Sequence, residues 1–183
     1  DTANAYTDSE EKLGTALRGV RQSVIISTKS AATEKKTAMA HIEESLRRLQ
    51  TDYIDLFQFH NPAKLPDSND PDGAFAAALE MQQKGYIRHI GITNHRLAVA
   101  EEAVRSGLYE TLQFPFSYLA DEKEEALVRL CEEHDVGFIC MKALAGGLIT
   151  HSDVAYAYLA QFPVAPIWGI QRESELDEFL SYN

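Results

Sequence analysis

The chain has 183 residues, of which 45% are hydrophobic, and its formal net charge at pH 7 is −11. This length and apolar content suit one globular domain better than two, so we expect a single domain over residues 1–183. The acidic balance disfavours a nucleic-acid partner, and no apolar stretch reaches the roughly 18 residues that a membrane span needs.

The predicted strands are short runs of β-branched and aromatic residues, most of them apolar on both faces. A segment reading DTANAY opens the chain as the end of a strand, and SEEKLGTALRG follows it as a helix. Strands are then expected at 24–29, 54–60, 89–93, 111–116, 137–142 and 165–170. Runs of this kind are typical of strands that are buried in a parallel sheet.

Amphipathic helices are predicted between these strands. Apolar residues recur at spacings of three and four after Thr33, after the loop PDSNDPDG, after Asp121 and again over 173–182. Successive strand–helix units imply a parallel sheet with right-handed crossovers. This rhythm alone allows either a doubly wound open sheet or a (β/α)₈ barrel.

The chemistry of the loops favours the barrel. A complete (β/α)₈ barrel typically needs about 250 residues. We therefore predict an α/β fold of the (β/α)₈ TIM-barrel type that lacks the first one to two strand units, so that the domain is incomplete at its N-terminus.

Four residues form the candidate catalytic set. Asp1, Lys29 and His60 end three successive predicted strands, where barrel enzymes carry their reacting groups, and Tyr6 lies in the first loop. A lysine charge near Tyr6 would stabilise its phenolate and make the phenol a usable general acid. Asp1 would hold that lysine, and His60 would orient a carbonyl oxygen. Protein side chains supply no hydride, so this set predicts a nicotinamide cofactor.

At these residues the sequence resembles the aldo-keto reductase family. DTANAY is similar to the family's D-x-A-x-x-Y segment, and STK, SLRRLQTDYIDLFQFH and GYIRHIGITNH follow in the family's order. The resemblance implies a barrel enzyme, an NAD(P)-dependent oxidoreductase that reduces a small aldehyde or ketone. It makes Tyr6 the proton donor, with Lys29 and Asp1 tuning it and His60 orienting the carbonyl.

The C-terminal part of the sequence is most similar to one bacterial branch of that family. The segments GLYETLQFPFSYL and PIWGIQRESELDEFL resemble predicted oxidoreductases in which an iron–sulfur-binding extension sometimes follows the barrel. The cysteine cluster of such an extension is not present in this sequence.

The resemblance also assigns cofactor contacts. Thr93, Asn94 and Gln113 match positions that hold the nicotinamide carboxamide, and Met141 matches a position where the family often stacks an aromatic ring. The pair Gly146 and Gly147 follows a predicted strand, where backbone N–H groups could approach a pyrophosphate.

The choice between NADP(H) and NAD(H) stays open. Arg172 is the only cation in GIQRESELDEFL, and Glu175 and Phe179 occupy positions where NADP-using members carry Arg and Asn. A carboxylate repels a 2′-phosphate, whereas it can accept hydrogen bonds from an unmodified ribose. The frequency of NADP(H) within the family favours that cofactor.

Two other functions stay open beside the reductase. One is a nucleotide-binding barrel with a regulatory or interaction role and little turnover. The other is a lyase or isomerase that uses a Schiff-base lysine, either Lys29 or Lys142. The expected partner is a small-molecule carbonyl substrate, no metal site is predicted, and the sequence identifies neither the substrate nor the oligomeric state. Cys131 and Cys140 are predicted to be buried thiols, which suits the reducing cytoplasm.

Overall fold

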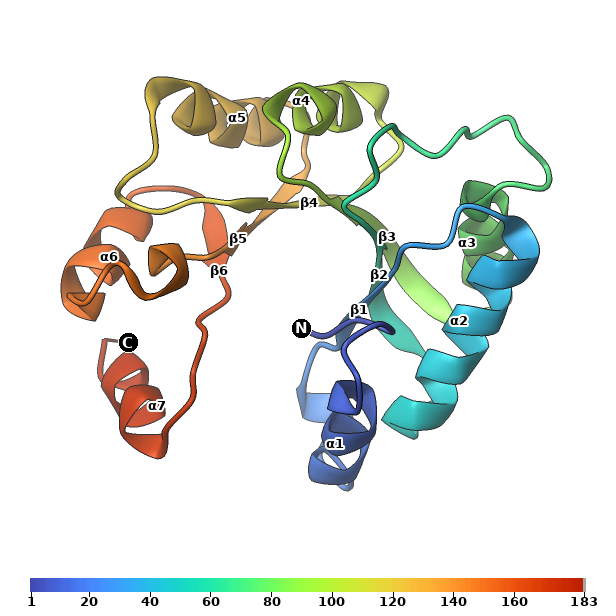
Figure 1. The fold of residues 1–183 in the computed structure, drawn as a ribbon, viewed down its shortest axis with the longest axis horizontal. Helices are drawn as coiled ribbons and strands as arrows, with labels where there is room; N and C mark the ends of the chain where they lie inside the picture. The colour runs from blue at the N-terminus through green and yellow to red at the C-terminus, as the bar shows by residue number, and fades with distance from the viewer. Residues whose placement is uncertain (183) are drawn as a thin grey trace. The chain divides into compact units, whose positions relative to one another are not determined.

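The computed structural model describes residues 1–182, over which six strands alternate with seven α-helices (Figure 1). The chain divides into two compact units, Asp1–Asn94 and the residues from His95 onward. Within each unit the strands are parallel and pair in chain order. None of the helices in this described part is long and apolar enough to cross a membrane.

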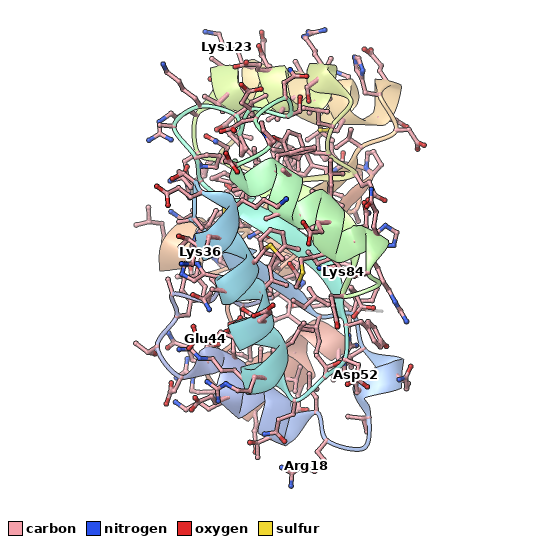
Figure 2. All side chains as sticks on the ribbon, turned by 90° about the vertical axis from the view of Figure 1, so that its right-hand side faces the viewer. Arg18, Lys36, Glu44, Asp52, Lys84 and Lys123 are labelled. Atoms are coloured by element: carbon pink, nitrogen blue, oxygen red, sulfur yellow. The ribbon has the colours of Figure 1, made fainter. Side chains whose placement is uncertain are left out.

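The first unit has three strands and three helices. The strands are β1 (Ser27–Ser30), β2 (Ile54–His60) and β3 (Ile87–Thr93), and the helices are α1 (Ser9–Ala16), α2 (Lys35–Leu49) and α3 (Ala74–Gln83). Helices α2 and α3 pack against each other and cover the outer side of the strands, as Figure 2 shows with Glu44 on α2 and Lys84 beside α3. The prediction for β2 is confirmed, and its first six residues are all buried, as expected of a strand covered on both faces.

The segment before α1 pairs with the outer edge of β1. The backbone N–H of Thr2 donates to the carbonyl of Ser27 at 2.8 Å, and the N–H of Asn4 donates to the carbonyl of Lys29 at 3.0 Å. The structure assigns no strand to DTANAY itself, so the prediction that this segment ends a strand is met only by these two bonds to β1. They also fix the register of this segment against β1, which places Asp1 and Tyr6 near the end of that strand.

The second unit repeats the same pattern. Its strands are β4 (Thr111–Pro115), β5 (Gly137–Met141) and β6 (Val164–Pro166), and its helices are α4 (Leu97–Ser106), α5 (Glu122–Glu133), α6 (Ser152–Leu159) and α7 (Glu173–Leu180). Helix α5 begins with a capping box in which the Asp121 carboxylate accepts from the N–H groups of Lys123 and Glu124. This arrangement satisfies backbone donors that the first turn leaves unpaired. Cys131 and Cys140 are free and buried, as predicted.

Two details of the sequence prediction are wrong. The strand expected at 165–170 is confined to Val164–Pro166, and Trp168 lies outside it, stacked on Phe179 with ring centroids 4.2 Å apart. The strand expected from residue 24 starts only at Ser27. His41 on α2 is half-buried, and its Nδ1 shares a hydrogen bond of 2.8 Å with the Ser30 hydroxyl.

A charged cluster closes the end of the first unit where its strands begin. The Asp55 carboxylate accepts from the Ile26 N–H at 2.9 Å and pairs with Arg21 at 2.8 Å and Arg88 at 2.9 Å. The two guanidinium groups lie 4.1 and 3.7 Å from the centroid of the Tyr53 ring. The Ile26 N–H and the two guanidinium groups therefore compensate the cost of burying the Asp55 carboxylate.

We expect Asp55→Asn to lower the free energy of unfolding by about 1–3 kcal/mol, because it weakens two charge-assisted hydrogen bonds and keeps the side-chain volume. A shift of the urea midpoint would measure this loss. Glu101→Gln, which alters an acid on α4, serves as the control. An unchanged midpoint for Asp55→Asn would show that the cluster adds nothing to stability.

Candidate active site

A buried lysine forms the centre of the candidate site. Lys29 lies on β1, and its side chain is only 2% exposed. Its Nζ donates to both carboxylate oxygens of Asp1 at 2.7 Å each and to the carbonyl of Thr2 at 2.5 Å. The backbone bonds between this segment and β1 bring these acceptors to the lysine. Asp1 and Lys29, predicted to pair, do so in the structure.

The buried position changes the acidity of the lysine. Loss of solvent lowers the pKa of the Lys29 ammonium from 10.5 to about 7, because a low dielectric disfavours the charged form. The three oxygen acceptors around Nζ favour the charged form in turn. Lys29 is thus held in a place where its charge can change near neutral pH.

Tyr6 and His60 lie beside this lysine. The Lys29 Nζ is 5.5 Å from the centroid of the Tyr6 ring, which is within the range of a cation–π contact. The rings of Tyr6 and His60 meet edge to face, with centroids 5.7 Å apart and planes at 80°. Tyr6 is 46% exposed, so its ring is open to solvent on one side. The structure therefore brings all four residues of the predicted catalytic set together.

The turn that carries Tyr6 is tightly wound. The Tyr6 N–H donates to the Ala3 carbonyl at 2.9 Å, and the Ser9 N–H donates to the Tyr6 carbonyl at 2.8 Å. Thr7, the next residue, has a φ of 41°. A β-branched residue in this left-handed region carries backbone strain, which a folded protein retains only where surrounding contacts enforce it.

Two of the predicted cofactor residues lie at the end of β3: Thr93 is its last residue, and Asn94 follows it. Thr93 is the register partner of His60 across the β2–β3 pair, and its hydroxyl accepts from the Asn61 N–H at 3.0 Å. The Asn94 side-chain amide donates to the Pro62 carbonyl at 2.9 Å. Both side chains are almost fully buried, at 2% and 0% exposure. They fasten the loop after β2 to the end of β3.

The other predicted cofactor residues belong to the second unit. Gln113 on β4 and Met141 on β5 are neighbours, with Nε2 and Sδ 3.8 Å apart. Gly146 and Gly147 have φ values of 70° and 97°, and a Cβ built on either of them would meet no atom within 4 Å. Their backbone is therefore open to a close approach, and the positive φ values explain why glycine occupies both positions.

Arg172 is engaged at the start of α7. Its Nε and Nη2 lie 2.9 and 2.7 Å from the Glu175 Oε1, and the Glu175 Oε2 accepts from the Gln171 N–H at 2.7 Å. The hydrogen bond from the Gln171 N–H has the largest effect, and together with the bonds from Arg172 it lowers the pKa of the Glu175 carboxyl. Arg172, the cation expected near a 2′-phosphate, is thus paired with Glu175, the carboxylate expected to repel that phosphate.

Sequence reasoning missed several buried or half-buried polar residues around the candidate set. Glu10 on α1 is 1% exposed and accepts from the Thr28 hydroxyl at 2.6 Å, while Arg48 on α2 donates to the Asn4 carbonyl at 3.1 Å. Gln58, fully buried on β2, is the register partner of Lys29 and donates to the Ser27 hydroxyl at 2.8 Å. The sequence held one signal for Gln58, a polar residue inside the apolar run IDLFQFH. The sequence contained no signal that distinguishes the buried Glu10 from the exposed Glu11.

Comparison with protein families gives a match to the aldo/keto reductase family over residues 1–153. Among curated proteins, the chain is 31% identical to the uncharacterized oxidoreductase YqkF of Bacillus subtilis over 171 residues, which are 86% of this chain and 55% of that protein. It is 32% identical to the aldo-keto reductase YhdN of the same organism, covering 82% of this chain and 49% of that protein. The chain therefore spans about half the length of these relatives.

A solved structure supports the same relation. The chain matches an aldo/keto reductase from Klebsiella pneumoniae, determined in complex with NADP and acetate, with a TM-score of 0.70 and 27% identity. The match covers 88% of this chain and 60% of that chain. The prediction of an α/β fold of the TIM-barrel type, covering only part of a barrel, is confirmed by this likeness.

Proposed function

Because this chain belongs to the aldo/keto reductase family, we propose that the intact protein reduces a small aldehyde or ketone with a reduced nicotinamide dinucleotide. The observation that carries the proposal is the contact of Lys29 with Asp1, beside the paired rings of Tyr6 and His60. Relatives named as methylglyoxal reductases share 33–35% identity over about half of the chain, which supports a small carbonyl compound as the substrate.

In this proposal Tyr6 donates a proton to the carbonyl oxygen as that oxygen gains negative charge. A phenol with its ordinary pKa near 10 is a weak acid at neutral pH. The ammonium of Lys29 stabilises the phenolate that remains after transfer, since opposite charges a few ångströms apart attract strongly in a partly buried site. Asp1 and the Thr2 carbonyl hold the ammonium in its buried position.

His60 orients the carbonyl. Its ring meets the Tyr6 ring edge to face at the end of β2. A hydrogen bond from the imidazole would place the carbonyl oxygen within reach of the phenol, and such positioning lowers the barrier without any new bond. The side chains of the set thus divide the work into proton donation, charge stabilisation and orientation.

The residues present fit a dinucleotide. Thr93 ends β3 beside His60 and Asn94 follows it, and the backbone of Gly146 and Gly147 is open where a Cβ would otherwise project. From the family resemblance we propose Thr93 and Asn94 of the first unit, and separately Gln113 of the second, as residues for the nicotinamide carboxamide, with Met141 for a packing contact and the two glycines for the pyrophosphate. When bound, the cofactor supplies the hydride. NADP(H) and NAD(H) both stay candidates, because Arg172 is paired with Glu175.

A turnover assay tests the proposal. The intact protein is mixed with NADPH or NADH and a panel of aldehydes and ketones, and the loss of reduced-nicotinamide absorbance is followed. Consumption that depends on the carbonyl compound supports the proposal. Cofactor binding without consumption would favour a regulatory barrel, and a borohydride-trapped adduct on Lys29 or Lys142 would favour Schiff-base chemistry.

The rate of carbonyl reduction is expected to fall as the pH rises through about 7. Lys29 has a pKa of about 7 and is charged below that value. Above it the ammonium loses its proton, so the negative charge that proton transfer leaves on Tyr6 is no longer stabilised and proton donation slows. The measurement is kcat/KM between pH 5 and 9. A rate that rises with pH over this range would contradict the assigned role of Lys29.

Lys29→Met is the matched variant for this profile. It removes the titrating group and keeps a long apolar side chain in the buried site. We expect a lower rate throughout and no step near pH 7. The same step persisting in Lys29→Met would assign it to another group.

We also propose that residues 1–183 belong to one domain and that the protein works in a reducing compartment such as the cytoplasm. The thiols of Cys131 and Cys140 are free, and burial raises the pKa of each to about 12. Buried thiols that form no disulfide are typical of proteins in a reducing compartment.

A further inference from the structure

We infer that Arg48 is a positioning residue, which holds the turn carrying Tyr6 in place from the side of α2. The inference rests on the proposed function, in which Tyr6 is the proton donor. Arg48 does not belong to the set that the sequence singled out, and it contacts neither Tyr6 nor Lys29 through a side-chain bond that the structure shows. It acts through the backbone at Asn4.

The backbone of Asn4 is held from two sides. Its N–H donates to the Lys29 carbonyl on β1 at 3.0 Å, and its carbonyl accepts from the Arg48 Nη1 at 3.1 Å. The Asn4 side-chain amide also reaches Glu44 on α2 at 3.5 Å. Asn4 stands two residues before Tyr6, and the Tyr6 N–H closes the next turn onto Ala3. The position of Tyr6 relative to Lys29 is therefore set by the bonds at Asn4.

Arg48 is itself fixed in a definite geometry. Its Nη2 pairs with the Glu44 Oε1 at 2.7 Å, one helical turn away on α2. Its Nη1 lies 3.6 Å from the Glu10 Oε2, and Glu10 is 1% exposed and bonded to the Thr28 hydroxyl of β1. A guanidinium presents several donors in a planar fork, so one side chain can serve the Asn4 carbonyl and two carboxylates together. Arg48 thus connects α1, α2 and the turn before α1.

Backbone strain in the turn explains why the contact of Arg48 with Asn4 matters for the position of Tyr6. Thr7 adopts a φ of 41° immediately after Tyr6, and a β-branched residue leaves that region when nothing enforces it. Relaxation of Thr7 would carry Tyr6 with it. The bonds at Asn4 oppose that relaxation, and Arg48 supplies the one that a side chain outside the turn makes to the Asn4 backbone.

The test compares Arg48→Met with Arg47→Met. The two arginines are neighbours on α2, but Arg47 is 70% exposed and makes only a 3.8 Å contact with Glu44. Arg48→Met leaves Glu10 buried without its counter-charge, which can prevent folding. The double variant Glu10→Gln/Arg48→Met avoids this, because glutamine is neutral and can still accept from the Thr28 hydroxyl.

We expect kcat for carbonyl reduction to fall about 10- to 100-fold in Glu10→Gln/Arg48→Met, since misplacement of a reacting group by about 1 Å has effects of this size. Cofactor affinity should be unchanged, because Thr93 and Asn94 lie at the end of β3, where they bond to the Asn61 N–H and the Pro62 carbonyl. Amide hydrogen exchange in residues 2–8 should become faster. Arg47→Met should alter none of these quantities.

The Tyr6→Phe background separates positioning from a general loss of structure. If Arg48 acts through Tyr6, the residual rate of Tyr6→Phe should fall no further when Glu10→Gln/Arg48→Met is added. An equal loss in both backgrounds, or an unchanged kcat with tyrosine present, would overturn the inference. Failure of the proposed function would be seen separately, as an inactive wild-type protein or a fully active Tyr6→Phe.

Discussion

Tyr6→Phe is expected to lower kcat for carbonyl reduction by about 100- to 10,000-fold, which is the usual contribution of a positioned general acid. The substitution removes the one phenol that lies beside both Lys29 and His60 among the described residues. It keeps the ring, so the edge-to-face contact with His60 should persist. Cofactor affinity should change little, since the residues assigned to the cofactor are untouched. Initial rates at saturating cofactor, together with a fluorescence titration of cofactor binding, measure both effects.

Tyr86→Phe provides the matched control. Tyr86 is 43% exposed, close to the 46% of Tyr6, but it precedes β3 at the opposite end of the strand from the candidate site. Its loss should leave kcat unchanged. Full activity in Tyr6→Phe would assign proton donation to another group and would leave the ring pair as a packing feature only.

Gly14→Ala is expected to destabilise the first unit by about 3 kcal/mol, at the upper end of what overpacking usually costs. A Cβ on Gly14 would lie 2.4 Å from the Arg48 carbonyl oxygen and 2.7 Å from the Leu49 carbonyl carbon. Both are backbone atoms in the last turn of α2, so relief requires the two helices to separate. Alanine is the better helix former by about 1 kcal/mol, and this gain offsets only part of the clash.

The same substitution should reduce catalysis in the molecules that stay folded. Glu10 and Gly14 lie on one face of α1, four residues apart, and the close approach at Gly14 brings Glu10 within 3.6 Å of Arg48. Urea denaturation measures the loss of stability. Thr15→Ala, at an exposed neighbouring position in α1, is the control, and it should leave the midpoint unchanged or raise it. An equal midpoint for Gly14→Ala and the wild type would show that the helices adjust without cost.

The sequence predicted the strands best where residues were apolar on both faces. The bounds 54–60 match β2, because burial on two sides leaves an uninterrupted apolar run. The prediction was wrong at 165–170, where PIWGI is equally apolar but only Val164–Pro166 forms a strand. There the apolar residues serve another purpose, since Trp168 packs on Phe179 of α7. Apolar content alone does not distinguish strand burial from contact with a helix.

The candidate site was predictable in part for a related reason. Asp1, Lys29 and His60 were predicted at strand ends, and strand ends can be read from a change in hydropathy. The supporting residues Glu10 and Arg48 lie on helices among many other charged residues. Which helical charges are buried depends on how α1 packs against α2, and the close approach at Gly14 that decides this is a tertiary feature. Sequence spacing on one helix carries no such information.

The stacking of Trp168 on Phe179 affects how unfolding of this protein would be observed. The chain has a single tryptophan, and it lies in the unit that begins at His95. Indole emission therefore reports the packing of α7 and carries no direct signal from Gly14, Arg48 or Tyr6. Circular dichroism samples the backbone of both units. Coincident transitions from the two methods would identify one cooperative block, whereas an earlier dichroic transition in Gly14→Ala would show that the two units unfold independently.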